Sequence, residues 1–119
     1  MSNIITAKQS PRLEDGKLIW YEGDTFSITL TLSLSDEVTD EAITLDSNST
    51  IVVSIYKAKI LVHRFEYNQF SDNQITMTFD DQVSRKFSAG EYTYTITHKC
   101  LNTTTLVANN IMEVEPCLQ

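Results

Sequence analysis

Glycine, proline and cysteine are all scarce in this chain of 119 residues, which has three glycines, two prolines and two cysteines. Two cysteines are too few for a fold built on disulfides. The glycines (Gly16, Gly23 and Gly90) are isolated, so no glycine-rich loop is present to hold a phosphate group. Cys100 and Cys117 are expected to be free thiols; the alternative is one bridge that ties the C-terminal residues to the last hairpin.

Basic residues are also few, since 9 Lys and Arg stand against 16 Asp and Glu and give a formal net charge of −7. Nucleic-acid binding normally needs a basic face that replaces the counterions of the phosphates. An anionic membrane surface attracts proteins by the same positive charge. Nucleic acid and membrane are therefore not expected as partners.

Long apolar runs are absent, and no segment approaches the eighteen uninterrupted apolar residues of a membrane-spanning helix. The first residues, Met1 to Lys8, lack the basic region and apolar run of a signal peptide, so none is predicted. Hydrophobic residues nevertheless make up 41% of the chain, which is too many for a disordered acidic tail. The length fits one domain with its own core.

Threonine, serine and β-branched or aromatic residues dominate instead, and these residue types favour strands. The clearest pattern runs from Phe26 to Ser35, where apolar and hydroxyl side chains alternate strictly. A period of two predicts a strand with one buried and one wet face. The predicted buried residues are Phe26, Ile28, Leu30, Leu32 and Leu34.

Six further segments show the same pattern and are predicted strands: Lys17–Tyr21, Thr50–Tyr56, Leu61–Tyr67, Gln74–Asp80, Glu91–Lys99 and Leu106–Val114. In the last of these, Leu106, Ala108, Met112 and Val114 are expected on one face, interrupted by Asn110; the alternative prediction is a bulge or kink at Asn109-Asn110. About seven strands separated by turns predict an all-β, antiparallel β-sandwich. The expected organisation is an N-terminal arm (1–16), the sandwich (17–115) and a short tail (116–119).

The connections carry weaker local signals. Residues 80–89 are expected to hold one helical turn, capped by Asp80 or Asp81, with Val83 and Phe87 on one side. The longest loop, Ser35–Ser49, contains five acidic residues and no Lys or Arg, and a short edge strand is expected near residues 42–45.

Groups with potential chemistry do not form a motif. The acidic pairs Asp36-Glu37, Asp40-Glu41 and Asp80-Asp81 lack the spacing of a calcium loop, and we interpret them as solvated loops or helix caps. His63 and His98 have no clustered ligands and are interpreted as strand-end or surface residues. Cys100 has no partner in a catalytic motif. We therefore expect no catalytic, cofactor or metal residues.

Aromatic residues offer one binding hypothesis, because exposed rings can stack on sugars. The candidates are Trp20, Tyr21, Tyr56, Tyr67 and Phe70. In a two-layer sandwich most aromatic side chains belong to the core, which is the interpretation that we prefer. A glycan-binding module stays open as the alternative function.

The most specific structural signal is Ala89-Gly90-Glu91-Tyr92-Thr93-Tyr94, in which a turn and a glycine precede a tyrosine that opens an alternating strand. Immunoglobulin-like sandwiches place a tyrosine at the corner between their sheets, with its hydroxyl bonded to the preceding loop. We expect Tyr92 to bond to backbone within residues 82–86. The predicted fold is thus an immunoglobulin-like antiparallel β-sandwich of about seven strands.

Over residues 17–115 the order of features resembles the immunoglobulin-like domains of tailed-phage virion proteins, in particular the N-terminal domain of phage baseplate upper proteins. The likeness lies in Glu22-Gly23-Asp24-Thr25-Phe26 before the long strand, the Ile51–Ile55 strand, and Ser88–Tyr94. The resemblance implies a non-enzymatic building block that is located in the virion after synthesis in the bacterial cytoplasm. Because the chain has one domain and no coiled coil, a small tail, baseplate or capsid accessory or decoration protein is expected.

The resemblance also implies the partners, which are other virion proteins, with a homo-oligomer or symmetric assembly. Edge strands and the arm over residues 1–16 are expected to supply the contacts, since strand addition relies on backbone hydrogen bonds. Head or tail location, the identity of the partner and the host are not encoded in any pattern of this sequence.

Overall fold

The computed structural model describes residues 10–35 and 38–116 and is mostly β, with 61% of residues in strands and 4% in helix. The elements are β1 (Arg12–Glu14), β2 (Lys17–Tyr21), β3 (Phe26–Thr31), β4 (Ser49–Lys57), β5 (Ile60–Tyr67), β6 (Gln74–Phe79), α1 (Asp81–Ser84), β7 (Gly90–Cys100) and β8 (Thr103–Glu115). The predicted all-β sandwich is confirmed. Its eight strands include one, β1, in the segment expected to be an arm.

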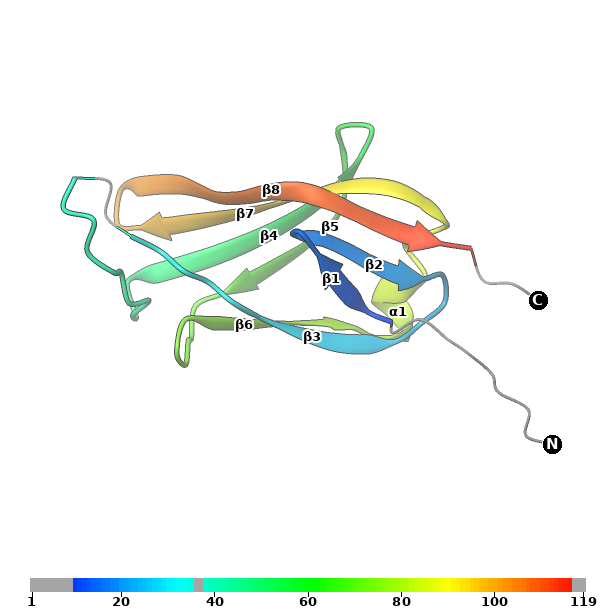
Figure 1. The fold of residues 1–119 in the computed structure, drawn as a ribbon, viewed down its shortest axis with the longest axis horizontal. Helices are drawn as coiled ribbons and strands as arrows, with labels where there is room; N and C mark the ends of the chain where they lie inside the picture. The colour runs from blue at the N-terminus through cyan, green and yellow to red at the C-terminus, as the bar shows by residue number, and fades with distance from the viewer. Residues whose placement is uncertain (1–9, 36–37, 117–119) are drawn as a thin grey trace.

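Two sheets of unequal size form the sandwich, one of six strands in the order β1-β2-β8-β7-β4-β5 and one of two strands, β3-β6. In Figure 1 the two-stranded sheet runs beneath the larger one. All neighbouring strands are antiparallel except β2 and β8, which pair in parallel from Leu18↔Met112 to Tyr21↔Glu115.

The strict alternation from Phe26 onward has the predicted effect, because the even-numbered side chains all pack on the core. The strand itself is shorter than predicted and ends at Thr31. Beyond that point the backbone bonds to loops, with Leu32 N donating to Asn73 O (2.8 Å) and Ile43 N to Leu34 O (2.9 Å). The edge strand expected at 42–45 is reduced to a single bridge between Ser35 and Ala42.

An aromatic cluster fills one end of the core. The Trp20 ring is fully buried and lies 5.2 Å from the rings of both Phe26 and Phe79 and 5.8 Å from that of Phe87. Phe87 contacts Tyr92 in turn, at 5.2 Å between ring centres. The predicted helical turn is confirmed as α1, which Asp80 caps by accepting a bond from Val83 N (2.9 Å).

The predicted tyrosine corner is present, but its acceptor differs. The Tyr92 hydroxyl donates to the carbonyl of Ser88 at 2.8 Å, outside the expected range 82–86. Within the helical turn, the carbonyls of Asp81, Val83 and Ser84 accept from the amides of Arg85, Lys86 and Phe87 in that order. Ser88 lies after that turn and has a carbonyl that is free to accept.

The first described residues are docked on their own chain. β1 pairs with β2 through the turn at Asp15-Gly16, which has positive φ at both positions (51° and 82°). The Tyr94 hydroxyl donates to Gly16 O, and the Asn110 amide donates to Asp15 O (3.2 Å). Part of the expected arm over 1–16 is therefore a hairpin of the large sheet, and residues 1–9 lie outside the described residues.

One long side of the sandwich is closed by contacts between the two sheets. The Tyr67 hydroxyl of β5 donates to Thr76 O of β6 (2.9 Å), and the rings of Phe65 and Phe79 lie 5.4 Å apart. Burial raises the pKa of Tyr67 to about 12, because the charged phenolate would lose its hydration there. The neutral tyrosine is thus the form that joins β5 to β6.

Candidate functional site

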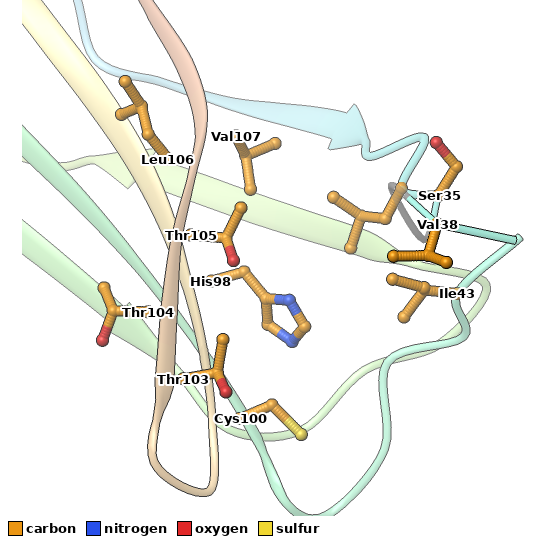
Figure 2. A pocket seen from close by; sticks show the side chains of 11 residues that line it. Ser35, Val38, Ile43, His98, Cys100, Thr103, Thr104, Thr105, Leu106 and Val107 are labelled. Carbon is orange, nitrogen blue, oxygen red and sulfur yellow. The ribbon is translucent and has the colours of Figure 1, made fainter. Parts of the chain in front are cut away.

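A groove of about 730 Å³ lies at the end of the sandwich where the β7–β8 hairpin extends past the two-stranded sheet. We call it the end groove (Figure 2). Its lining residues are Leu34, Ser35, Val38, Ile43, His98, Cys100, Thr103, Thr104, Thr105, Leu106 and Val107. One wall thus comes from β7 and β8 and the other from the chain that follows β3.

A β-bulge decides which residues of β8 face this groove. Ile96 pairs with Ala108 but Thr97 pairs with Leu106, so Val107 is an extra residue in β8. A single extra residue exchanges the two faces of the strand beyond it. Thr105 therefore lies opposite the inward-facing His98, while Leu106, expected in the core, is 58% exposed. The bulge predicted at Asn109-Asn110 is thus wrong by two residues, because Asn110 is held in register by its bond to the Asp15 turn.

His98 is buried, with 8% exposure, and lies two residues before the end of β7, which agrees with its interpretation as a strand-end residue. Its Nε2 lies 3.0 Å from Ser49 Oγ, and that hydroxyl donates to Asp46 Oδ1 at 3.4 Å. Because the Ser49 hydroxyl donates its only proton to Asp46, it accepts the hydrogen bond from His98. The Nε2 atom of His98 is therefore the donor and carries the proton of the neutral ring. Figure 2 shows the ring projecting into the groove, where Nδ1 is then an acceptor for a bound group.

Cys100 follows two residues after His98 on the same face of β7 and is a free, partly exposed cysteine at the groove wall. Cys117, its expected alternative partner, lies outside the described residues. Within the described part of the chain, no hydrogen bond joins the Cys100 thiol to the imidazole of His98.

The remaining candidates lie apart from this groove. His63 of β5 has its Nδ1 3.1 Å from Lys86 Nζ. Burial, assisted by the positive charge of Lys86 and opposed by Asp80, lowers the pKa of His63 below 6.5. Asp80 caps α1 and Asp81 forms an ion pair with Arg85, in agreement with their interpretation as cap and loop residues.

Neither a metal-binding cluster nor a membrane-spanning helix occurs over residues 10–35 and 38–116. These residues contain no group of three or more His, Cys, Asp or Glu side chains that could hold a metal ion. The same ranges contain no helix that is long and apolar enough to cross a membrane. Asp36 and Glu37, one of the acidic pairs, lie outside the described residues.

The aromatic candidates divide between core and surface. Trp20 is completely buried and cannot stack on a sugar, while Tyr21, Tyr56, Tyr67 and Phe70 are partly buried. Tyr67 and Phe70 pack against the core. The proposed sugar platform thus loses its largest ring to the interior.

Two features of the groove were not predicted, and only one had a signal in the sequence. Ser49 lies two residues before the buried Ile51, so its side chain points to the same face of the strand. Starting the predicted strand at residue 49 instead of Thr50 would have placed Ser49 inward, beside His98. The bulge at Val107 had no such signal, because the preceding residues, Thr103-Thr104-Thr105, are identical and do not show which of them faces the core. Comparison with known proteins found no family model, no curated protein and no solved structure that matches this chain.

Proposed function

We propose that this chain is a non-enzymatic structural protein of a tailed-phage virion, a tail, baseplate or capsid accessory protein that acts through protein–protein contacts. The observation that carries the proposal is the concentration of exposed apolar side chains at the end groove. Val38 on its rim is 93% exposed, and Leu101 at the adjacent hairpin tip is 82% exposed. Monomeric proteins rarely leave such side chains grouped in water unless a partner covers them.

The chemistry of the groove indicates what kind of partner fits. Its walls are mainly aliphatic and hydroxyl-bearing, and the imidazole of His98 is positioned by Ser49. The loop on its other wall, Ser35–Ser49, has five acidic residues and no basic one. An apolar side chain flanked by Lys or Arg on a neighbouring virion protein would complement both properties.

The resemblance to phage immunoglobulin-like domains supports the biological setting of this proposal. The residues that carry it include Gly23-Asp24, which precede β3, and Gly90-Glu91-Tyr92, which open β7 with the tyrosine corner. In a symmetric particle every copy repeats the same contact, so many individually weak contacts together stabilise the assembly. Burial of Trp20 also favours this function over a glycan-binding module, which needs an exposed aromatic surface.

The test uses phage particles purified on a density gradient from the host that carries the coding sequence. We expect the chain in the particles by mass spectrometry, at a copy number that matches a symmetric position. Val38→Glu should lower incorporation by at least about tenfold, because a charge in the contact leaves a buried, unpaired carboxylate. Ile60→Glu is the matched control, since Ile60 is 70% exposed but lies at the β4–β5 hairpin.

Folding of both variants is checked by circular dichroism before incorporation is measured. Absence of the chain from the particles would overturn the virion function. Equal loss of incorporation for Val38→Glu and Ile60→Glu would show that the end groove is not the contact surface.

A further inference from the structure

The bulge at Val107 turns Leu106 to the outer face of the large sheet, the face opposite the core. Residues that pair directly across neighbouring strands share a face, and Val52, Thr97 and Leu106 form one such row. Ile96, the neighbour of Thr97 along β7, packs in the core, so this row points away from the core. Leu106 is 58% exposed there. Because bulges often re-aim a side chain, this position indicates a contact outside the core.

The surface around Leu106 has no charge at its centre. Residues 50–56, 92–98 and 106–111 contain no Lys, Arg, Asp or Glu, and they are neighbouring stretches of β4, β7 and β8. Charged residues are otherwise frequent, since they make up 21% of the whole chain. The centre of a protein contact is depleted of charged residues, while its rim is polar. We call the outward side chains of these three stretches the outer face.

Charged side chains border the outer face on both sides, and each side carries both signs. On β5, Arg64 and Glu66 pair with outward residues of β4 and form an ion pair (3.3 Å). On the opposite side, Lys17 of β2 forms an ion pair with Glu113 of β8 (3.1 Å), and Arg12 of β1 contacts two further glutamates. Much of the acidic surplus lies elsewhere, because the loop between β3 and β4 has five acidic residues and no basic one.

We propose that the outer face binds the same face of a second copy of this chain, so that two large sheets stack in a two-fold symmetric dimer. Stacked sheets pack about 10 Å apart with their strands nearly aligned. When the symmetry axis is parallel to the strands, the β5 side of one copy lies over the β1–β2 side of the other. Arg64 then faces a side with glutamates, and Glu66 faces a side with Arg12 and Lys17, so the rims are complementary.

The row that contains Leu106 lies near the centre of this contact. β8 and β7 are the third and fourth of the six strands, so the symmetry axis passes between them. Leu106 of one copy then packs against β7 of the other, beside Thr95 and Thr97. The Thr97 hydroxyl already donates to Val52 O at 3.5 Å, so it keeps a partner when the contact excludes water.

A second copy fits this face better than a partner with a strong charge of one sign. Each copy has a net charge of −7, so two copies repel each other wherever their acidic loops approach. On the outer face this repulsion is low, because the centre is neutral and both signs border it. A strongly basic or acidic partner would meet no field of opposite sign there. This inference concerns self-association and does not rest on the virion function, whose contact surface is the end groove.

Sedimentation equilibrium of the full chain at several concentrations tests the proposal. The unaltered protein should form a dimer, and Leu106→Glu should raise the dissociation constant by at least about tenfold, because two unpaired carboxylates meet near the symmetry axis. Val38→Glu is the matched control, since it also replaces an exposed aliphatic side chain by glutamate but lies at the end groove. It should change the dissociation constant by less than about twofold.

Thr95→Glu places the same charge at the centre from β7 and should weaken the dimer as Leu106→Glu does. Circular dichroism checks the fold of each variant. A chain that stays monomeric at millimolar concentration would overturn the proposal, and so would equal weakening by Leu106→Glu and Val38→Glu. A dimer that neither Leu106→Glu nor Thr95→Glu weakens would overturn it in favour of another surface. The dimer is measured without phage particles, so its absence would leave the virion function standing.

Discussion

Single residues at the Asp15-Gly16 turn join three parts of the large sheet. Gly16 has φ +82°, and a Cβ at this position would overlap the amide nitrogen of Asn110. That amide donates to Asp15 O, while the Tyr94 hydroxyl donates to Gly16 O. The turn thus accepts hydrogen bonds from two polar side chains, one on β7 and one on β8.

Gly16→Ala should therefore destabilise the protein more than Gly23→Ala. Both glycines have positive φ, but Gly23 has no atom within 4 Å of a built Cβ. We expect Gly23→Ala to cost roughly 1 kcal/mol through backbone strain. Gly16→Ala should cost about 1 kcal/mol more, because Asn110 must also give up its hydrogen bond.

Urea unfolding of both variants measures the difference in the free energy of unfolding. Adding Asn110→Ala to Gly16→Ala should cost less than the sum of the two single changes, since they remove the same contact. Equal destabilisation by the two glycine substitutions would show that the overlap with Asn110 has no energetic effect.

At the scale of elements, the connection between β6 and β7 is a compact corner. Asp80 caps α1, Phe87 is buried against Trp20, and Tyr92 bonds back to Ser88 O. The first contact lies within the connection, the second packs it against β2, and the third joins it to β7. The corner therefore fixes the start of β7, the strand that carries His98 and Cys100 to the end groove.

Tyr92→Phe removes the hydroxyl of this corner while keeping the buried ring. We expect a loss of about 1 kcal/mol in the free energy of unfolding, the usual value for one hydrogen bond. Thermal or urea denaturation provides the measurement. Tyr56→Phe is the control, because its partly buried hydroxyl makes no hydrogen bond to the described residues and its removal should be nearly neutral.

If both tyrosine substitutions have the same effect, the Tyr92–Ser88 bond contributes nothing specific to the stability of the corner. The difference in unfolding free energy between Tyr92→Phe and the unaltered protein should not change with pH, because no charged group takes part in this bond.

For the whole molecule, pH dependence follows from His63, which joins β5 to the corner through Lys86. Its pKa lies below 6.5 in the folded protein, so the unfolded chain binds the proton more tightly. The contribution of His63 to stability is complete above pH 6.5 and is lost as the pH falls through the lowered pKa. We expect His63→Gln to reduce the loss of stability between pH 7.5 and pH 5.

Urea unfolding of the two proteins at both pH values makes this comparison, and an NMR titration of the imidazole reports the pKa directly. Lys86→Gln should raise the pKa of His63, because it removes the positive charge that lowers it. A pKa at or above 6.5 in the unaltered protein would contradict the prediction.

Local patterns in the sequence were sufficient for most of the strands. The alternation from Phe26 to Leu34 and the odd-numbered row from Ile51 to Ile55 mark side chains that all pack in the core. Strand periodicity depends only on neighbouring residues along the chain, so it can be read without knowledge of the partner strand. The capping role of Asp80 and the tyrosine corner are local for the same reason.

The end groove was not predictable in this way. It depends on the bulge at Val107, which reverses the faces of β8. It also depends on the contact between Ser49 and His98, which lie 49 residues apart in the sequence. The two-strand size of the second sheet likewise depends on which strands pair. Composition and periodicity alone determined the all-β class and the buried face of most strands, because both arise from local side-chain alternation. Strand pairing and register were decided only in the tertiary structure, because they arise from contacts between distant segments.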